Sequence, residues 1–228
     1  NEKFEKNFSK ITGSKYSIST NSCTTAIQIA LEYYKVKGFD VMVPSGSFQS
    51  GISAIKWAGA NPILVDMNPQ TLSFSMEDLK KKITSKTKGI IWVHVTGVIS
   101  SEYKKIIQFA KSKNLFIIED CAHAQGSSID KKKAGILGNV GVFSFFPSKI
   151  MSTGSGGMMT TGDKDLAEFT MKMRIFGRNL NKPGVSLEGN DWFMDEIRAC
   201  VGYHQLLDFE NNLKRRKAIA KMYDKAFK

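Results

Sequence analysis

Lys149 is well placed for covalent chemistry. It ends the segment Phe143-Ser144-Phe145-Phe146-Pro147-Ser148-Lys149, in which an apolar strand and a turn precede the amine. Partial burial lowers the pKa of an amine and makes it nucleophilic, as a Schiff-base lysine requires. Ser144 stands five residues earlier and could reach a phosphate. The alternative is a solvated surface lysine, which describes most lysines of this chain.

A second candidate is the acid in the segment Ile117-Ile118-Glu119-Asp120-Cys121-Ala122-His123-Ala124. An acidic residue at the end of an apolar strand lies over the ligand crevice of a parallel sheet. A buried carboxylate there would hold a heteroaromatic nitrogen protonated. His123 could contact a phenolic oxygen or stack on a ring. The alternative is a capping Asp120 and a histidine satisfied in the core, and for His123 alone that alternative is preferred.

Two further segments could surround an anion. Asn21–Thr25 leads into a helix, whose first N–H groups are unpaired and favour a phosphate, although an ordinary N-cap explains the segment equally well. Gly154–Gly157 allows close backbone approach, although a plain turn is sufficient. We expect no metal site, because His94, His123 and His204 are dispersed and no Glu stands at ligand spacing from them.

These segments lie within alternating strands and helices. Apolar strands are expected at 41–43, 63–65, 89–95, 115–118, 142–145 and 158–161. Helices are expected at 24–36, 50–58, 76–83, 101–113 and 164–175, and from 194 to the end with an interruption near Asp208; 177–190 reads as a polar loop. The alternation predicts an α/β fold, a three-layer αβα sandwich with a mainly parallel sheet. The site is then expected beyond the carboxyl ends of the strands.

Composition narrows the class of protein. The 228 residues suit one large domain or one domain with a short extension. Three separate cysteines fit reduced thiols in the cytoplasm, and no apolar stretch is long enough to cross a bilayer, so we expect no membrane partner. A net charge of +12 would suit nucleic acid. The lysine clusters have no interleaved aromatic residues, so we expect no nucleic-acid partner and a preference for anionic small molecules.

Taken in order, these segments resemble the PLP-dependent sugar aminotransferases of fold type I, the DegT-type family within the aspartate aminotransferase superfamily. The resemblance covers nearly the whole chain and rests on Ser22–Ile27, Val43–Phe48, Gly59–Asp66, Glu119–Ala124 and Phe143–Lys149. It implies a PLP-binding large domain at 1–193. A C-terminal helical segment at 194–228 would then lead to a small domain that is missing from this sequence.

The resemblance also implies a reaction. Lys149 would carry pyridoxal 5'-phosphate as a Schiff base and move a proton, and Asp120 would pair with the pyridine nitrogen. Relatives with histidine in place of this lysine are dehydratases, so Lys149 favours transfer of an amino group from an amino acid, expected to be L-glutamate, to a nucleotide-linked keto-sugar. The other cofactor contacts that the resemblance implies are Cys23, Thr24 and Ser144 at the phosphate, Phe48 stacked on the ring, and His123.

Two segments depart from the family pattern. Ser155 stands where an acidic residue is usual, and Gly189-Asn190-Asp191-Trp192-Phe193-Met194 replaces Gly-Tyr-Asn-Tyr-Arg-Met. In the family, the Asn of that motif reaches the cofactor phosphate of the neighbouring subunit of a homodimer, and a homodimer is expected here on the resemblance alone. Asp191 would repel a phosphate, and Phe193 lacks a positive charge. The alternative is therefore a degenerate or truncated paralogue that acts as a non-catalytic binding or scaffold module.

Overall fold

A seven-stranded sheet forms the centre of the molecule in the computed structural model, which describes residues 1–179 and 182–227. The strand order is β1-β11-β10-β7-β6-β2-β3, and within this sheet β11 alone runs opposite to the other strands. The mainly parallel sheet expected from the sequence is confirmed. Its strands are β1 (Tyr16–Thr20), β2 (Asp40–Pro44), β3 (Asn61–Val65), β6 (Thr87–Val93), β7 (Phe116–Asp120), β10 (Val140–Ser144) and β11 (Gly157–Thr161).

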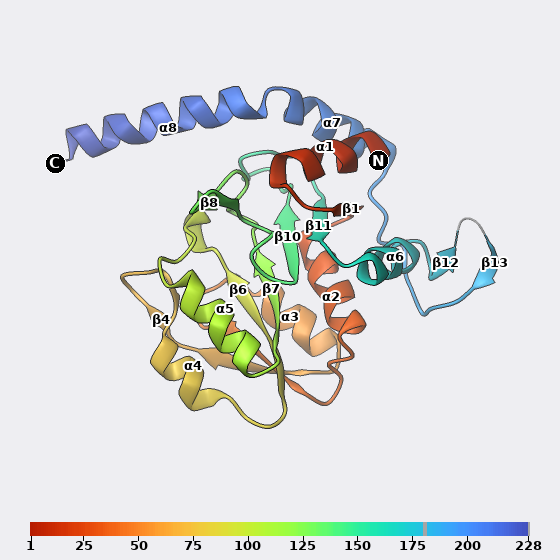
Figure 1. Ribbon diagram of the computed structural model, residues 1–228. Helices are drawn as coiled ribbons and strands as arrows, with labels where there is room; N and C mark the ends of the chain where they lie inside the picture. Colours follow the sequence, from red (N-terminus) through yellow and green to blue (C-terminus); the bar gives the residue numbers. More distant parts are fainter. Residues whose placement is uncertain (180–181, 228) are drawn as a thin grey trace.

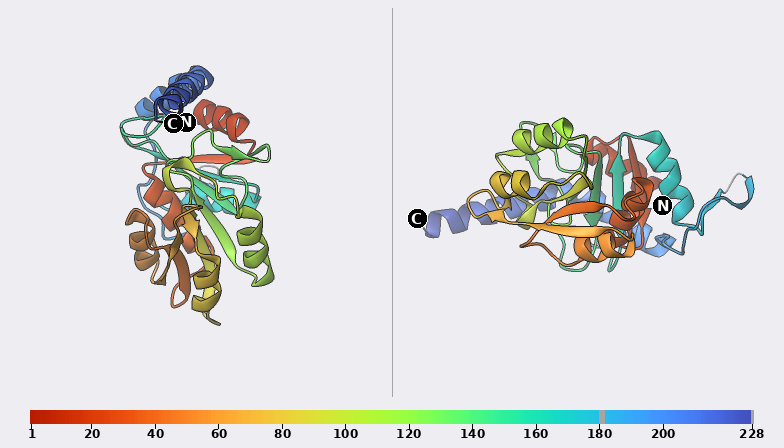
Figure 2. Two further views of the ribbon diagram at one scale, coloured as in Figure 1. Left: turned by 90° about the vertical axis from the view of Figure 1, so that its left-hand side faces the viewer. Right: turned by 90° about the horizontal axis from the view of Figure 1, so that it is seen from below.

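Helices cover both faces of this sheet. α2 (Cys23–Tyr33), α3 (Ser50–Trp57) and α6 (Lys164–Met173) pack on one face; α1 (Glu2–Thr12), α4 (Met76–Lys82) and α5 (Tyr103–Ser112) pack on the other (Figures 1 and 2). Successive strand residues point to opposite faces, so Val142 joins one core cluster and Phe143 the other. The strands β2, β7 and β10 are buried along their whole length, which explains why they read as largely apolar runs.

The sequence prediction missed the first helix and strand. α1 buries Phe4, Phe8 and Thr12, which recur every four residues and so lie on one face of the helix. The Phe8 ring lies 4.9 Å from the ring of Phe143 and 5.6 Å from that of Phe145, measured between centroids. The charged residues between these three positions lower the average hydropathy, so the segment reads as polar unless its periodicity is examined.

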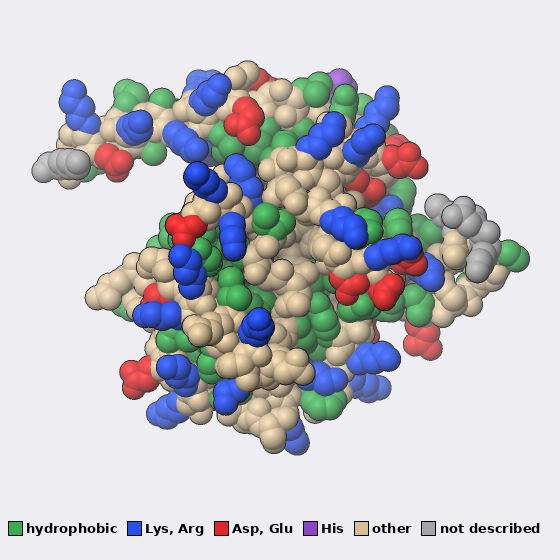
Figure 3. Space-filling model, viewed as in Figure 1, with side chains coloured by type: hydrophobic (Ala, Val, Ile, Leu, Met, Phe, Trp, Pro, Cys, Tyr) green, Lys and Arg blue, Asp and Glu red, His purple; other side chains and the backbone are tan. Residues whose placement is uncertain are grey.

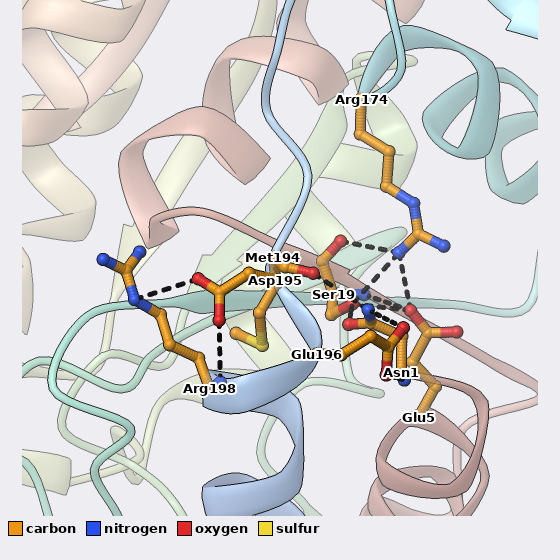
Figure 4. A network of polar contacts seen from close by, with 8 residues as sticks. All are labelled: Asn1, Glu5, Ser19, Arg174, Met194, Asp195, Glu196 and Arg198. Carbon is orange, nitrogen blue, oxygen red and sulfur yellow. Dashed lines mark hydrogen bonds and ion pairs between the residues drawn. The ribbon is translucent and has the colours of Figure 1, made fainter.

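A polar network fastens α1 to the end of α6 (Figure 4). The Nη1 group of Arg174 donates to Glu5 Oε1 at 2.6 Å and to the carbonyl oxygen of Ser19 at 2.7 Å. Glu5 Oε1 also accepts the N–H of Ser19 at 2.8 Å. Arg174 is 9% exposed, so this ion pair is screened little by water.

The prediction that residues 177–190 form a polar loop is wrong in part. It contains a short hairpin of β12 (Arg178–Asn179) and β13 (Lys182–Val185), which stands away from the main body in Figure 1. Strands this short show no detectable periodicity, and Val185 is 64% exposed, so no apolar pattern marked them. The other short elements are β4 (Met67–Asn68), β5 (Ser73–Phe74), η1 (Val95–Gly97), β8 (Ser128–Ile129) and β9 (Lys132–Lys133).

Two helices follow the sheet. α7 (Glu196–Leu207) and α8 (Phe209–Ala226) are separated at Asp208, where the sequence predicted an interruption. Phe209 is buried in the core, whereas the far end of α8 projects beyond the sheet (Figure 1). In the part of the chain that the structure describes, no helix has the length and apolar character needed to span a membrane.

Candidate active site

A cavity of about 510 Å³ opens at the carboxyl ends of β2, β6, β7 and β10, beside the start of α2. This is where a parallel sheet is expected to place its ligand. The structure brings all seven residues predicted as site residues into the lining of this cavity. They are Cys23, Thr24, Phe48, Asp120, His123, Ser144 and Lys149.

Asp120 is a buried acid at the wall of the cavity. It is the last residue of β7, is 6% exposed, and accepts the N–H of Ala122 through Oδ1 at 3.0 Å. Burial raises the pKa of Asp120, and the Ala122 N–H together with the charges of His94, His123 and Lys149 offsets this only in part. A protonated ring nitrogen beside the carboxylate would favour its ionised form. The site therefore suits a cationic heteroaromatic ligand.

Lys149 follows β10 in a turn and reaches the same cavity as Asp120. Its N–H donates to the carbonyl oxygen of Phe146 at 2.9 Å, which closes the turn. Burial, followed by the charge of Lys149, lowers the pKa of His123. His123 is therefore a neutral imidazole near pH 7, able to contact a ring without adding a second positive charge.

The start of α2 forms a cradle for an anion. Ser22 Oγ accepts the N–H of Thr25 at 3.1 Å, which leaves the N–H groups of Cys23 and Thr24 for a ligand, because first-turn N–H groups have no partner within the helix. Strand β11 lies directly against this turn at Gly157, where a Cβ atom would overlap the backbone of Ser22 and Cys23. Ser144 Oγ lines the same cavity. These groups fit a phosphate, since helix N-termini favour negative charge.

Two aromatic side chains mark the mouth of the cavity. Phe48 is 75% exposed and Phe146 is 57% exposed, and both line the opening. Exposed aromatic rings beside a cavity are available to cover a flat ligand. Stacking of Phe48 on a bound ring stays a prediction.

Sequence reasoning missed a buried pair beside the cavity. His94 Nε2 lies 2.9 Å from Glu119 Oε2, and both side chains are fully buried. The pair forms because β6 and β7 are neighbouring strands, a relation that the dispersed positions of the histidines concealed. Glu119 also accepts three backbone N–H groups that hold the next loop against β7, those of Gly135, Leu137 and Gly138.

The same pair belongs to a cluster with the composition of a metal site. His94, Glu119 and Cys121 offer ligand atoms within 4.8 Å of one another. However, each carboxylate oxygen of Glu119 already accepts two hydrogen bonds. We therefore assign this cluster a structural role.

Three of the residues that depart from the family pattern lie in distinct places. Ser155 lines the cavity, and its hydroxyl donates to the carbonyl oxygen of Asn21 at 3.3 Å. Asp191 is exposed and is not among the cavity-lining residues of its own chain. Phe193 lies beneath Arg174, with its ring centroid 5.2 Å from the guanidinium carbon. Phe193 thus contacts the positive charge of Arg174, whereas the Arg of the family motif would itself be positively charged.

The fold and site define the class of protein. A mainly parallel seven-stranded sheet with a lysine, an aspartate and a helix N-terminus at one edge is the large domain of PLP-dependent transferases. A DegT DnrJ EryC1 StrS aminotransferase from Brucella abortus is similar with a TM-score of 0.93 and 30% identity, over 99% of this chain and 62% of that chain. The PLP form of Spr1654 from Streptococcus pneumoniae, a candidate sugar aminotransferase, is similar with a TM-score of 0.92 and 26% identity. The match covers 99% of this chain and 63% of that chain.

The chain belongs to the DegT/DnrJ/EryC1/StrS aminotransferase family, whose sequence model matches residues 1–228. A GDP-perosamine synthase from Escherichia coli O157:H7 is 35% identical over 226 residues, which are 98% of this chain and 62% of that relative. The chain thus spans about three fifths of the length of the curated relatives it matches.

Proposed function

We propose that this protein is a PLP-dependent aminotransferase that moves an amino group from an amino acid, with L-glutamate as the expected donor, to a nucleotide-linked keto-sugar. The observation that carries the proposal is that Lys149, Asp120 and the start of α2 line a single cavity. The name of the relative GDP-perosamine synthase supports a nucleotide-linked amino sugar as the product class.

Each residue of the site would have a distinct role in binding the cofactor or in proton transfer. Bound PLP would supply the electron sink that the reaction requires. The N–H groups of Cys23 and Thr24, together with Ser144, would bind its phosphate, and Asp120 would keep a proton on its ring nitrogen. Lys149 Nζ would hold the cofactor covalently and, when its amine is free, would accept and return the proton that the exchange requires.

The overall exchange is balanced without a further reactant. The amino acid leaves as a 2-oxo acid, and the carbonyl oxygen of the sugar is replaced by the amino group. Lysine at position 149 supports amino transfer over dehydration, since the resemblance connects the dehydratases with histidine there.

The non-catalytic alternative rests on Asp191 and Phe193. Asp191 is exposed away from the cavity of its own chain, and Phe193 lies under Arg174. In the family the position of Asp191 faces the neighbouring subunit, and neither residue lines the cavity of its own chain. Lys149, Asp120 and Ser144 remain in that cavity, which supports the enzyme. We also propose a homodimer on the basis of the family, and a cytoplasmic location on the basis of three free cysteines.

An absorbance titration tests this function. PLP added to the purified protein is expected to give a protein-bound band, which L-glutamate converts to the pyridoxamine form. The Lys149→Ala variant is expected to give no covalent adduct. A wild-type band that ignores every amino-acid donor, or the absence of a band, would contradict the proposal.

A further inference from the structure

Gln125 is a buried side chain that the proposed mechanism does not use. It is 3% exposed, lies in the segment that follows β7, and is not among the residues lining the active-site cavity. Its Nε2 group donates to the carbonyl oxygen of Ser144 at 2.7 Å and to that of Met151 at 3.3 Å. Its Oε1 atom accepts the N–H of Met151 at 2.7 Å. A primary amide is the side chain that supplies two donors and an acceptor in this arrangement.

These three hydrogen bonds join the two ends of the loop that carries Lys149. Ser144 is the last residue of β10, and Met151 comes two residues after the lysine. One side chain thus fixes the separation between the start and the end of a six-residue turn, 145–150. A hydrogen bond from the N–H of Thr153 to the carbonyl oxygen of Phe145, at 3.0 Å, supports the same closure.

Gln125 also belongs to the segment that carries Asp120 and His123, two residues that line the cavity. It comes five residues after Asp120 and two after His123 on a single segment. This segment is itself held in place, because Ser127 Oγ donates to the carbonyl oxygen of Gly97 at 2.7 Å. The Gln125 amide is therefore a direct link between the segment that carries Asp120 and the loop that carries Lys149.

We propose that Gln125 is a positioning residue, which sets the place of Lys149 Nζ relative to Asp120 without touching the cofactor. The inference rests on the proposed function. Lysine side chains have many rotamers, so the position of the amine depends on how firmly its backbone is held. A loop tied at both ends keeps the amine within reach of a bound aldehyde, which raises the effective concentration for covalent attachment.

The test compares Gln125→Met with Thr160→Val. Gln125→Met keeps the approximate size of the side chain and removes all three hydrogen bonds. Thr160→Val removes a buried hydrogen bond to the carbonyl oxygen of Gly135, which lies outside the Lys149 loop. Both variants are expected to lose stability, since buried polar groups lose partners, so thermal unfolding alone would not separate them.

PLP affinity and the rate of covalent attachment, followed by absorbance, provide the separating measurement. Gln125→Met is expected to weaken PLP binding at least about tenfold and to slow attachment, whereas Thr160→Val leaves both near wild type. In a Lys149→Ala background, Gln125→Met is expected to change the remaining non-covalent affinity less than about twofold, because its effect passes through the lysine.

The outcomes distinguish this inference from the proposed function. Wild-type attachment with an unchanged Gln125→Met variant would overturn the positioning role alone. An equal loss of affinity with and without the Lys149→Ala substitution would overturn it as well, because Gln125 would then support the whole cavity. A wild-type protein that forms no adduct would overturn both the inference and the function on which it rests.

Discussion

Asp120 illustrates how one residue joins stability to function. Its carboxylate is buried at the end of β7, and burial raises its pKa above the ordinary range. A raised pKa means that the folded protein binds the proton more tightly than the unfolded chain. The ionised form that the proposed reaction requires is therefore held at a cost to the cofactor-free fold.

The Asp120→Asn variant is expected to stabilise the cofactor-free protein and to impair catalysis. With a raised folded pKa, the stability linked to protonation is fully present below the ordinary pKa of an aspartate and is lost as the pH rises through the folded pKa. Cofactor-free Asp120→Asn is therefore expected to resist urea better than wild type at about pH 7, with a difference that shrinks toward about pH 4. Turnover with PLP is expected to fall roughly 100-fold, because a charge-assisted hydrogen bond is lost.

Asp66→Asn is the matched control, because the carboxylate of Asp66 is 74% exposed. It should leave both the urea midpoint and the turnover near wild type. A cofactor-free Asp120→Asn protein that is less stable than wild type near neutral pH, or one that retains full turnover, would contradict the role given to Asp120.

The sequence predicted the positions of some site residues but not the long-range contacts of others. Asp120 ends an apolar run, and Lys149 follows another apolar run after a turn, so the local sequence placed both near the carboxyl ends of strands. His94 and Gln125 act through partners far along the chain, Glu119 and Met151 respectively, and only the folded arrangement brings these together. Their roles depend on strand order and loop path, which one sequence does not specify.

At the scale of elements, the anion cradle depends on the contact between α2 and β11. Gly157 is the point of closest approach, where any side chain would overlap the backbone at Ser22 and Cys23. The sequence marked Gly154–Gly157 only as a turn. The close approach depends on β11 running antiparallel between β10 and β1, an arrangement that the sequence alone did not predict.

Gly157→Ala is expected to push β11 away from the start of α2. We expect the free energy of unfolding to fall by about 1–3 kcal/mol, as for an overpacked core, and PLP affinity to fall at least about tenfold. Gly162→Ala is the control, because a Cβ atom there meets open space. Equal PLP affinities for the two variants, measured by absorbance titration, would show that this contact does not shape the phosphate site.

Helices and strands were predicted correctly where the hydrophobic pattern extended over many residues. They were missed where the pattern was short or interrupted by charged residues. The break between α7 and α8 at Asp208 was predicted from the sequence. α1 was missed because charged residues separate Phe4 and Phe8, and β12 and β13 because they contain few residues. Resemblance to a family could indicate the site, but not these peripheral elements.

At the scale of the whole molecule, the net charge is strongly positive. The net charge is +12, and Figure 3 shows Lys and Arg side chains scattered over the face in view, interspersed with acidic residues. A positive field attracts anionic small molecules. The arrangement agrees with a proposed substrate that carries phosphate groups.

The buried pair of Arg174 and Glu5 joins the beginning of the chain to the end of α6 (Figure 4). Arg174→Met is expected to lower the free energy of unfolding by about 3 kcal/mol, because it leaves the carboxylate of Glu5 without its cation. Arg198→Met is expected to have little effect, since its pair with Asp195 is largely exposed. Urea unfolding of both variants is the measurement, and equal midpoints would contradict the role of the Arg174 network.

Covalent attachment of the cofactor at Lys149 is the central claim, and borohydride reduction followed by peptide mass spectrometry tests it most directly. The wild-type protein, incubated with PLP and reduced, is expected to carry the phosphopyridoxyl group on the peptide that contains Lys149, with far less on the surface lysines. The Lys149→Arg variant, treated in the same way, is expected to lose this specific label. Labelling spread equally over surface lysines in both proteins, or concentrated at another lysine, would contradict the account.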